Sequence, residues 1–587
     1  MRISHCKLTV SAFLGLVQWV YCDKVEFKLD LTWEKHEVAG ITKNTILTNG
    51  QFPGPTLRMN QGDDVSIVVN NTMPFATSIH WHGIQQQGTP WSDGVPGLTQ
   101  KSIKSGEQFT YSWRADDYGA YLYHSHHSAQ LDDGLYGAIY VDPKPSLERP
   151  FTKISLDPEQ IQALRRAERN THPIILSDWR TFTSDEIIKI EEDSGVENYC
   201  ASSILLNGKG SVICPSQEHI NDLTRSELKQ VLNGRNMTDM GCMPPTPSRL
   251  GFFPFNATNI PTGYYQGCKP TQGEKEVLHV NPIWKWVSYD VSSMAGSSEF
   301  VFSIDEHPMY IYAVDGRYVE PTLVSALTVH IGTRYSIMVK LDKPAGNYTI
   351  RAANSYTNQI INGTAILNYD PPFEQFRPSK PYITEIGTSV TSNTTFLTES
   401  NLIPFPSVKP SQDVSQTHIL NLHLHNSSYM WELSNTTYPM SIQELPVPAL
   451  FNRSAIPPEN TISTLNGTWV DLIVNVTGGQ PQHPLHKHSN KFFVIGSGTS
   501  EWKYASVAEA VEDIPGNFNL VNPQYRDTYP TPTSRGGPSW LALRYFVQNP
   551  GPFFFHCHVM MHEYGGLGVA LLDGVDAWPV VPLEYQL

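Results

Sequence analysis

Four short histidine-rich motifs, two near each end of the chain, constrain the fold of this sequence more than any other feature. Residues i and i+2 of a β-strand project from the same face, so each His-x-His pair can offer two imidazoles to one site. Imidazole nitrogens are good ligands for copper and zinc. One such pair is often only structural, but four together predict a metal-binding protein. The motifs are His80-Trp-His82, His124-Ser-His126, His483-Pro-Leu-His486-Lys-His488 and His556-Cys-His558-Val-Met-Met-His562.

The tripeptide His556-Cys557-His558 is the most specific of these signals. If it is extended, its two imidazoles point one way and its thiolate points the other, so one tripeptide touches two metal sites. A single Cys with two His ligands has the softness and ligand number of a mononuclear blue-copper centre. Cys557, His562 and His483 form such a set, and the sequence therefore predicts two covalently connected metal sites.

The eight remaining histidines form four His-x-His pairs, two pairs in each terminal region. This symmetry predicts an internal duplication and a multinuclear cluster at the interface between the first and last domains, where ligand sites usually form. Leu567 stands five residues after His562, where a weak axial ligand of a blue-copper centre is expected. Its carbon side chain cannot donate to copper, so we expect a relatively high reduction potential.

Length and composition predict three β-rich domains. A chain of 587 residues is too long for one hydrophobic core. Its 41 Gly, 44 Pro and 11% aromatic residues favour strands with many turns over helical bundles. Period-two alternation and the breaks between such runs predict β-sandwich or barrel domains at residues 23–145, 155–370 and 417–587. A polar, helical stretch is expected from Pro158 to Asn170, and a Pro/Ser/Thr-rich linker at residues 371–416.

The amino-terminal segment and the net charge indicate the compartment. Arg2 and Lys7 precede an apolar run from Leu8 to Val20, which predicts a signal peptide at residues 1–22 and a mature chain from Asp23. No later segment holds eighteen uninterrupted apolar residues, so we expect no membrane anchor. The formal charge of −15 argues against nucleic acid as a partner. We expect a secreted extracellular monomer, glycosylated at some of its eleven Asn-x-Ser/Thr sequences.

Four cysteines lie close together in the middle of the sequence. In an oxidising compartment Cys200, Cys214, Cys242 and Cys268 are expected to form two disulfides, with three possible pairings that the sequence does not separate. Cys557 remains without a partner, which agrees with its expected role as a metal ligand.

The four motifs resemble those of the multicopper oxidases, and the three-domain length resembles the fungal laccases. Neighbouring stretches agree, including Asn49 to Pro55, Trp91 to Gly97 and Asn549 to Pro552. The resemblance implies three consecutive cupredoxin-like Greek-key domains and four copper ions. In this family, electrons from a reducing substrate enter at type 1 copper and pass through the cysteine to a cluster that reduces dioxygen to water. The implied type 1 ligands are His483, Cys557 and His562; the type 2 ligands are His80 and His486; and the type 3 ligands are His82, His124, His126, His488, His556 and His558.

The resemblance also implies roles for two side chains in the reaction. Asp93 matches the family's carboxylate beside the cluster, which is expected to steer protons and bound water. The exposed edge of His562 is expected to collect the electron. The stretch from Tyr123 to Gly134 is similar to laccases that ascomycete moulds use in spore pigment. We therefore expect oxidation of phenols or naphthols, such as a dihydroxynaphthalene, to radicals that couple into a melanin-like polymer at the spore surface or cell wall.

Two alternatives remain open, and three details depart from the family pattern. The chain could be a ferroxidase of the same superfamily or a copper-binding protein without catalytic activity. Thr99 to Ser102 lacks the cysteine that many relatives carry there, so we expect no disulfide tether from domain one. His127 is expected to be structural because an alternating strand turns it away from the cluster. His423-Leu-His425 imitates a ligand pair, but we expect a solvated strand.

Overall fold

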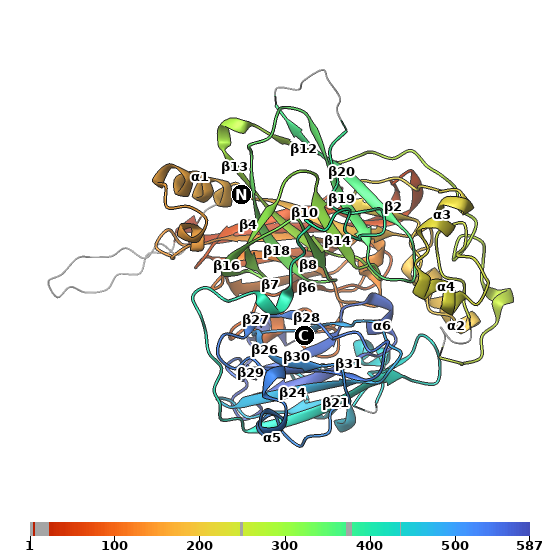
Figure 1. Cartoon of the computed structure of the whole chain (residues 1–587). Coiled ribbons are helices and arrows are strands. Elements are labelled where there is room, and N and C mark those ends of the chain that lie inside the picture. Colours follow the sequence, from red (N-terminus) through yellow and green to blue (C-terminus); the bar gives the residue numbers. More distant parts are fainter. Residues whose placement is uncertain (1–3, 6–22, 247–250, 371–377, 435, 587) are drawn as a thin grey trace.

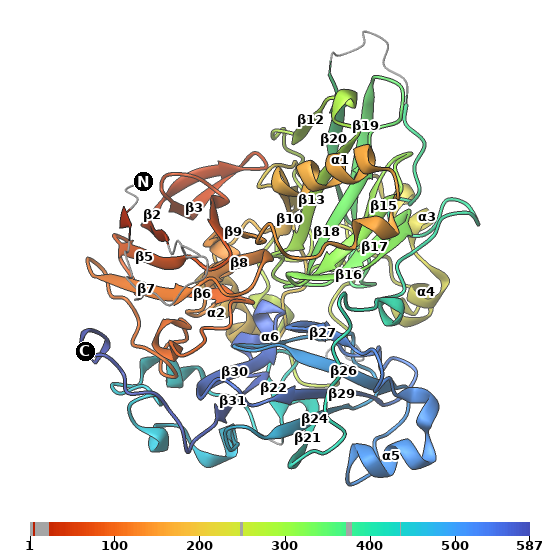
Figure 2. The same ribbon diagram turned by 90° about the vertical axis from the view of Figure 1, so that its left-hand side faces the viewer.

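Six β-sheets form three pairs along the chain. The computed structural model describes residues 4–5, 23–246, 251–370, 378–434 and 436–586, so the expected signal peptide lies almost wholly outside the described residues, as does part of the expected linker. Figure 2 shows the three pairs as three lobes, coloured red to orange, green, and blue. The predicted class, three consecutive β-sandwich domains, is confirmed, whereas the domain boundaries stay a prediction.

The first pair positions the two amino-terminal motifs. Its five-stranded sheet contains β1 (Ser4–His5), β2 (Asp23–Val38), β3 (Ile41–Thr48), β5 (Asp64–Asn71) and β7 (Gln108–Arg114). Its four-stranded sheet contains β4 (Gly54–Asn60), β9 (Tyr136–Asp142), β8 (Gly119–Ser125) and β6 (Ile79–His82). β6 and β8 are antiparallel and place His80 directly opposite His124.

The second pair forms the middle of the molecule. Its six-stranded sheet contains β11 (Ser203–Leu206), β10 (His172–Trp179), β13 (Trp286–Ser293), β18 (Arg334–Lys340), β15 (Met309–Val314) and β16 (Arg317–Val324). Its five-stranded sheet contains β12 (Val277–Val280), β20 (Asn362–Tyr369), β19 (Asn347–Asn354), β14 (Phe300–Ile304) and β17 (Ala326–Val329). Connections carry α1 (Pro158–Arg169), α2 (Ser184–Ser194), α3 (Gln217–Leu223) and α4 (Ser226–Leu232). α1 is the expected helical stretch, and the Asp157 carboxylate caps it by accepting the Glu159 N–H.

The third pair repeats the arrangement of the first around its own motifs. Its six-stranded sheet contains β22 (Trp431–Leu433), β21 (Gln416–Leu424), β24 (Trp469–Val476), β29 (Ser539–Phe546), β26 (Phe492–Gly498) and β27 (Gln524–Arg526). Its five-stranded sheet contains β23 (Thr461–Ser463), β31 (Gly568–Asp573), β30 (Gly551–Cys557), β25 (Pro484–Lys487) and β28 (Thr528–Pro530). The helices are α5 (Val507–Asp513) and α6 (Met560–Tyr564). Antiparallel pairing of β25 and β30 places His486 opposite His556, as β6 and β8 do for His80 and His124.

The described part of the expected linker follows the middle pair before it enters the third. The Leu397 N–H donates to Ala326, and the Phe405 N–H donates to Tyr318. Figure 1 shows this segment running along the outside between the upper and lower parts of the molecule. These bonds give backbone groups of the linker partners in β17 and β16, and so attach it to the middle pair.

Two disulfides and the short helix α6 are the remaining features of the fold. The four central cysteines pair as Cys200–Cys242 and Cys214–Cys268, which selects one of the three possible pairings. α6 lies where the three lobes meet (Figure 2), and its Met560 N–H donates to Gly296 of the middle pair. Within the described residues, no helix combines the length and apolar character needed to cross a membrane.

Candidate metal centres

The strand pairs β6–β8 and β25–β30 bring eight histidines together between the first and third sheet pairs. Every one of these side chains is buried. Their ring nitrogens face one another in three groups of three, and two of the groups have His488 in common. The groups are His82, His124 and His558; His126, His488 and His556; and His80 and His486 with His488.

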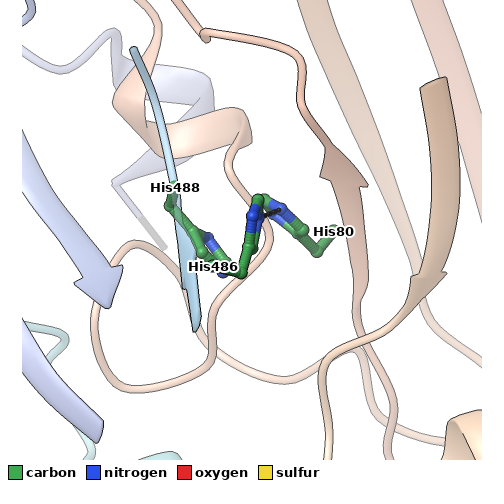
Figure 3. Close-up of side chains that lie close together, drawn as sticks. All are labelled: His80, His486 and His488. Carbon is green, nitrogen blue, oxygen red and sulfur yellow. Dashed lines mark hydrogen bonds between the residues drawn. The ribbon is translucent and has the colours of Figure 1, made fainter. Parts of the chain in front are cut away.

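The nitrogen–nitrogen distances in these groups suit ligands of a shared metal ion. His558 Nε2 lies 3.1 Å from His82 Nδ1 and 3.3 Å from His124 Nε2. His80 Nε2 lies 3.4 Å from His486 Nε2, and Figure 3 shows the rings of these two residues turned toward each other. Metal–nitrogen bonds of about 2.0–2.1 Å in a tetrahedral arrangement separate neighbouring nitrogens by about 3.3 Å. The spacing of the nitrogens therefore fits ligands of a shared metal ion.

The charge state of the imidazoles also fits metal ligation. Burial lowers the pKa of His82 to about 4 and the pKa values of His124 and His126 to about 3. Neutral imidazole is the form that binds metal. His126 Nε2 is buried and has no hydrogen-bond partner among the described residues. A buried polar nitrogen without a partner is costly, and a metal ion at this position removes that cost.

A second kind of centre lies on the other face of β30. The Cys557 thiol is buried, forms no disulfide, and lies 3.7 Å from His483 Nδ1 and 3.5 Å from His562 Nδ1. The two imidazole nitrogens are 3.2 Å apart. The ring of Trp431 packs against both imidazoles, with centroid distances of 4.9 and 4.3 Å. One soft sulfur and two nitrogens in a dry pocket make a donor set suited to blue copper.

The tripeptide His556-Cys557-His558 joins the two kinds of centre. Its two imidazoles belong to two different three-histidine groups. Its sulfur belongs to the Cys–His centre, with His483 and His562, on the opposite face. This is the alternation that an extended backbone imposes. Leu567 is fully buried beside this site, and its carbonyl accepts the Cys557 N–H at 3.0 Å. Leu567 and Cys557 share one buried apolar cluster, and the role of Leu567 as the residue at the axial position stays a prediction.

Acidic residues hold the histidines in place. His488 Nδ1 lies 2.9 Å from the Asp93 carboxylate, and His80 Nδ1 lies 2.7 Å from the Asp93 carbonyl oxygen. Such partners fix which ring nitrogen faces the metal. Sequence reasoning identified Asp93 but missed two other acids. Asp527 accepts from His486 Nδ1 through its carbonyl at 3.0 Å. Glu563 lies 3.4 Å from His126 and 3.2 Å from His556.

Only one of the missed residues left a signal in the sequence. Glu563 directly follows His562, and α6 turns it back toward the cluster. Asp527 has no spacing that links it to a motif, because only the β27–β28 turn brings it close to the histidines.

The histidines that the sequence predicted not to bind the cluster lie outside it. His127 Nε2 faces Glu444 at 3.5 Å, and His423 and His425 lie on the outer surface of the third sheet pair, with 34% and 38% of their side chains exposed.

A cavity of about 680 Å³ opens beside the Cys–His centre. His562 lines it, and His562 Nε2 contacts the Glu197 carboxylate at 2.7 Å. Tyr199 and Met243 line the same cavity, each next to one half-cystine of the Cys200–Cys242 disulfide. No motif marks Glu197, because it lies in an irregular segment after α2. The sequence pointed to His562 as the residue that collects the electron, but it marked none of the other residues of this cavity.

A Cys–His centre joined by one tripeptide to a buried eight-histidine cluster, on three β-sandwiches, defines a copper-dependent oxidoreductase. Comparison with known proteins agrees. Three family profiles described as "Multicopper oxidase" match residues 30–146, 170–372 and 420–577. The chain belongs to the multicopper oxidase family, whose standard complement is four copper ions, and its histidine and cysteine donors fit copper.

Individual relatives cover nearly the whole chain. "Laccase abr2" of Aspergillus fumigatus is 42% identical, over 97% of this chain and 98% of its own length. "Multicopper oxidase MCE" of Talaromyces pinophilus is 40% identical, over 95% of this chain and 94% of its own. The crystal structure of a laccase from Botrytis aclada superposes with a TM-score of 0.72 at 24% identity, covering 96% of this chain and 90% of that one. That likeness shows the same fold.

Proposed function

We propose that this protein is a secreted laccase that oxidises phenols or naphthols by one electron in the cavity beside His562. The cavity itself carries this proposal, because it places the imidazole edge of a buried Cys–His centre within reach of a small aromatic molecule. Copper at these centres supplies the one-electron oxidation and the reduction of dioxygen to water. The balanced reaction converts four phenols and one dioxygen into four phenoxyl radicals and two waters.

The ligand assignment is part of the proposal. His483, Cys557 and His562 are the type 1 ligands, and the grouping of their donor atoms supports this. His80 and His486 are the type 2 ligands. The six remaining histidines divide into two groups of three, which suits a type 3 pair. The type 3 ligands are His82, His124, His126, His488, His556 and His558.

The residues of the cavity support a phenolic donor. A phenol that loses an electron becomes strongly acidic, so its oxidation is helped by a base at the hydroxyl group. The Glu197 carboxylate touches His562 Nε2 and lines the cavity, so it is placed to accept that proton. Arg225 and Arg535 line the same cavity. Glu227 lines the cavity as well, so the two guanidinium groups offset the two carboxylates and the cavity offers a ferrous ion no net negative charge, which favours the laccase over the ferroxidase alternative.

The natural donor and the location complete the proposal. The donor that we propose is a dihydroxynaphthalene-type pigment precursor, whose radicals would couple outside the enzyme into a melanin-like polymer. The cavity volume of about 680 Å³ supports an aromatic donor of this size. Relatives named as laccases at 40–42% identity support this class of donor. We further propose an extracellular monomer, at the spore surface or in the cell wall, with a signal peptide at residues 1–22.

Oxygen uptake by the copper-loaded protein tests the function. We expect uptake with dihydroxynaphthalene and diphenols, and little with ferrous iron. Failure with every phenolic donor would refute the laccase assignment, and efficient uptake with ferrous iron alone would favour a ferroxidase.

The Glu197→Gln variant tests the role of the carboxylate. It keeps the shape of the side chain but removes the base, so we expect kcat/KM for phenols to fall by about 100-fold. Ferrocyanide loses an electron but no proton, and its oxidation should change little. Glu159→Gln, at an exposed glutamate of α1, is the control. Equal losses with phenols and ferrocyanide would contradict the role of Glu197 as a base.

A further inference from the structure

A second, smaller group of metal-binding side chains lies on the outside of the third sheet pair. β21 and β22 form an antiparallel hairpin at the edge of their sheet, and His423 is directly opposite Glu432. His423 Nε2 lies 2.7 Å from one oxygen of the Glu432 carboxylate, and His425 Nδ1 contacts the other oxygen. Two imidazoles therefore converge on one carboxylate.

The backbone fixes this convergence. His423 and His425 are two residues apart on one face of the chain. The His425 N–H donates to the Met430 carbonyl at 2.8 Å, so the hairpin pairing continues beyond the end of β21. Glu432 is the cross-strand neighbour of His423, and such pairs have Cβ atoms about 5 Å apart. All three donor groups thus come from a hydrogen-bonded ladder rather than from a loose loop.

The exposure of the side chains suits an exchangeable ion. The Glu432 side chain is 13% exposed, whereas the two imidazoles are about a third exposed. The carboxylate is therefore held under the rings. The Asn426 amide contacts His425 Nε2 at 2.9 Å, so Nδ1 is the nitrogen of this ring that faces Glu432. The exposed His219–Glu385 pair differs, because only one imidazole meets that carboxylate at 2.9 Å.

We propose that His423, His425 and Glu432 bind one divalent ion of the copper–zinc group, in addition to the four coppers. Two imidazoles and one carboxylate are a protein ligand set for zinc that leaves further positions to water. Harder ions such as Mg²⁺ prefer all-oxygen ligands. The ion replaces the contacts between rings and carboxylate and ties β21 to β22.

The position of this site links it to the Cys–His centre. Glu432 directly follows Trp431, and β-strand alternation points the two side chains to opposite faces of the sheet. The inner residue, Trp431, packs on His483 and His562. The outer ion therefore stabilises the strand that backs the mononuclear centre. An ion that binds only the folded protein raises its thermal stability.

Zinc titration of the copper-loaded full-length protein tests the proposal. We expect one Zn²⁺ per chain beyond the four coppers, measured by calorimetry and elemental analysis, and a rise in the unfolding temperature. Mg²⁺ at the same concentration should produce neither effect.

Variants separate this site from other surface groups. His423→Gln, His425→Gln and Glu432→Gln should each weaken zinc binding at least tenfold and abolish the rise in unfolding temperature. The matched control His219→Gln removes one exposed His–Glu pair and should bind zinc as the unmodified protein does. Copper content and the blue absorption band report whether each variant is folded. Absence of a fifth metal ion, or zinc binding that the three folded variants retain, would overturn the proposal.

Discussion

We predict that Leu567 raises the reduction potential of the mononuclear centre, because its side chain offers no donor atom. Its side chain is fully buried, and its carbonyl accepts the Cys557 N–H. Neighbouring apolar residues, including Trp431, exclude water from the same centre. In blue-copper sites the axial ligand and the surrounding hydrophobicity tune the reduction potential. A carbon side chain in a dry pocket favours the reduced, less charged ion.

The Leu567→Met variant tests this at the residue scale. A thioether at this position stabilises the oxidised ion, so we expect the type 1 reduction potential to fall. A fall on the order of 60 mV corresponds to a tenfold change in a one-electron equilibrium constant. Redox titration of the blue band measures the shift. The control is Leu571→Met, at a fully buried leucine within β31. An unchanged or higher reduction potential in Leu567→Met would contradict the role of Leu567.

At the scale of elements, the turn that follows η1 (Pro90–Ser92) places a carboxylate beside the histidines. Asp93 follows η1 and contacts one histidine of the first pair and one of the third, His80 and His488. The next residue is a glycine of necessity. Gly94 has φ of 92°, and a Cβ there would lie 1.9 Å from the Ile79 carbonyl oxygen. The turn is therefore pressed against β6, which holds the Asp93 carboxylate beside the cluster.

Asp93→Asn tests this turn. The amide keeps the shape of the side chain but removes a carboxylate oxygen beside His488 Nδ1, where we predict that the carboxylate orients the ring and moves protons. We expect kcat for dioxygen reduction to fall by about 10- to 100-fold, in the range typical of residues that support metal ligands. Oxygen uptake at saturating donor measures it, with copper analysis alongside. Asp116→Asn at an exposed aspartate should have no effect, and full activity of Asp93→Asn would refute the role of the turn.

Local patterns predicted the strands better than they predicted the supporting residues. The alternation of His556-Cys557-His558 gave the two faces of β30, because side-chain direction depends only on neighbouring residues. Glu197 and Asp527 reach their histidine partners through contacts between segments far apart in the sequence. No periodicity encodes such contacts. The His423–His425 pair was visible in the sequence, but its third member was not.

At the scale of the whole molecule, Arg334 connects all three sheet pairs. It belongs to β18 of the middle pair, and its guanidinium forms two bonds with Asp527 of the third, one of them 2.7 Å long. Its Nε donates to the Ala120 carbonyl of the first pair at 3.2 Å. The carboxyl-terminal segment adds a second connection between the third and first pairs, where the Tyr585 ring packs 5.6 Å from that of Trp91. Noncovalent contacts thus join the first and third pairs, for which we expected no disulfide tether from domain one.

Arg334→Leu tests this connection. Removing one partner of a buried ion pair leaves the Asp527 charge poorly compensated, so we expect a loss of about 3–5 kcal/mol in the free energy of unfolding. Chemical unfolding in guanidinium chloride measures the change in this free energy. Arg58→Leu removes a partly exposed pair with Asp142 inside the first sheet pair and should cost about 1 kcal/mol or less. Equal effects of the two variants would contradict a special role for Arg334.

The copper content of the purified protein and of its Cys557→Ser variant tests the central claim most directly. Elemental analysis with visible and spin-resonance spectra counts the ions and separates their types. The account predicts four coppers and a blue band in the unmodified protein. In the variant it predicts three coppers, no blue band and an intact type 2 signal. A blue band that survives in Cys557→Ser, or fewer than four coppers in the fully loaded protein, would contradict it.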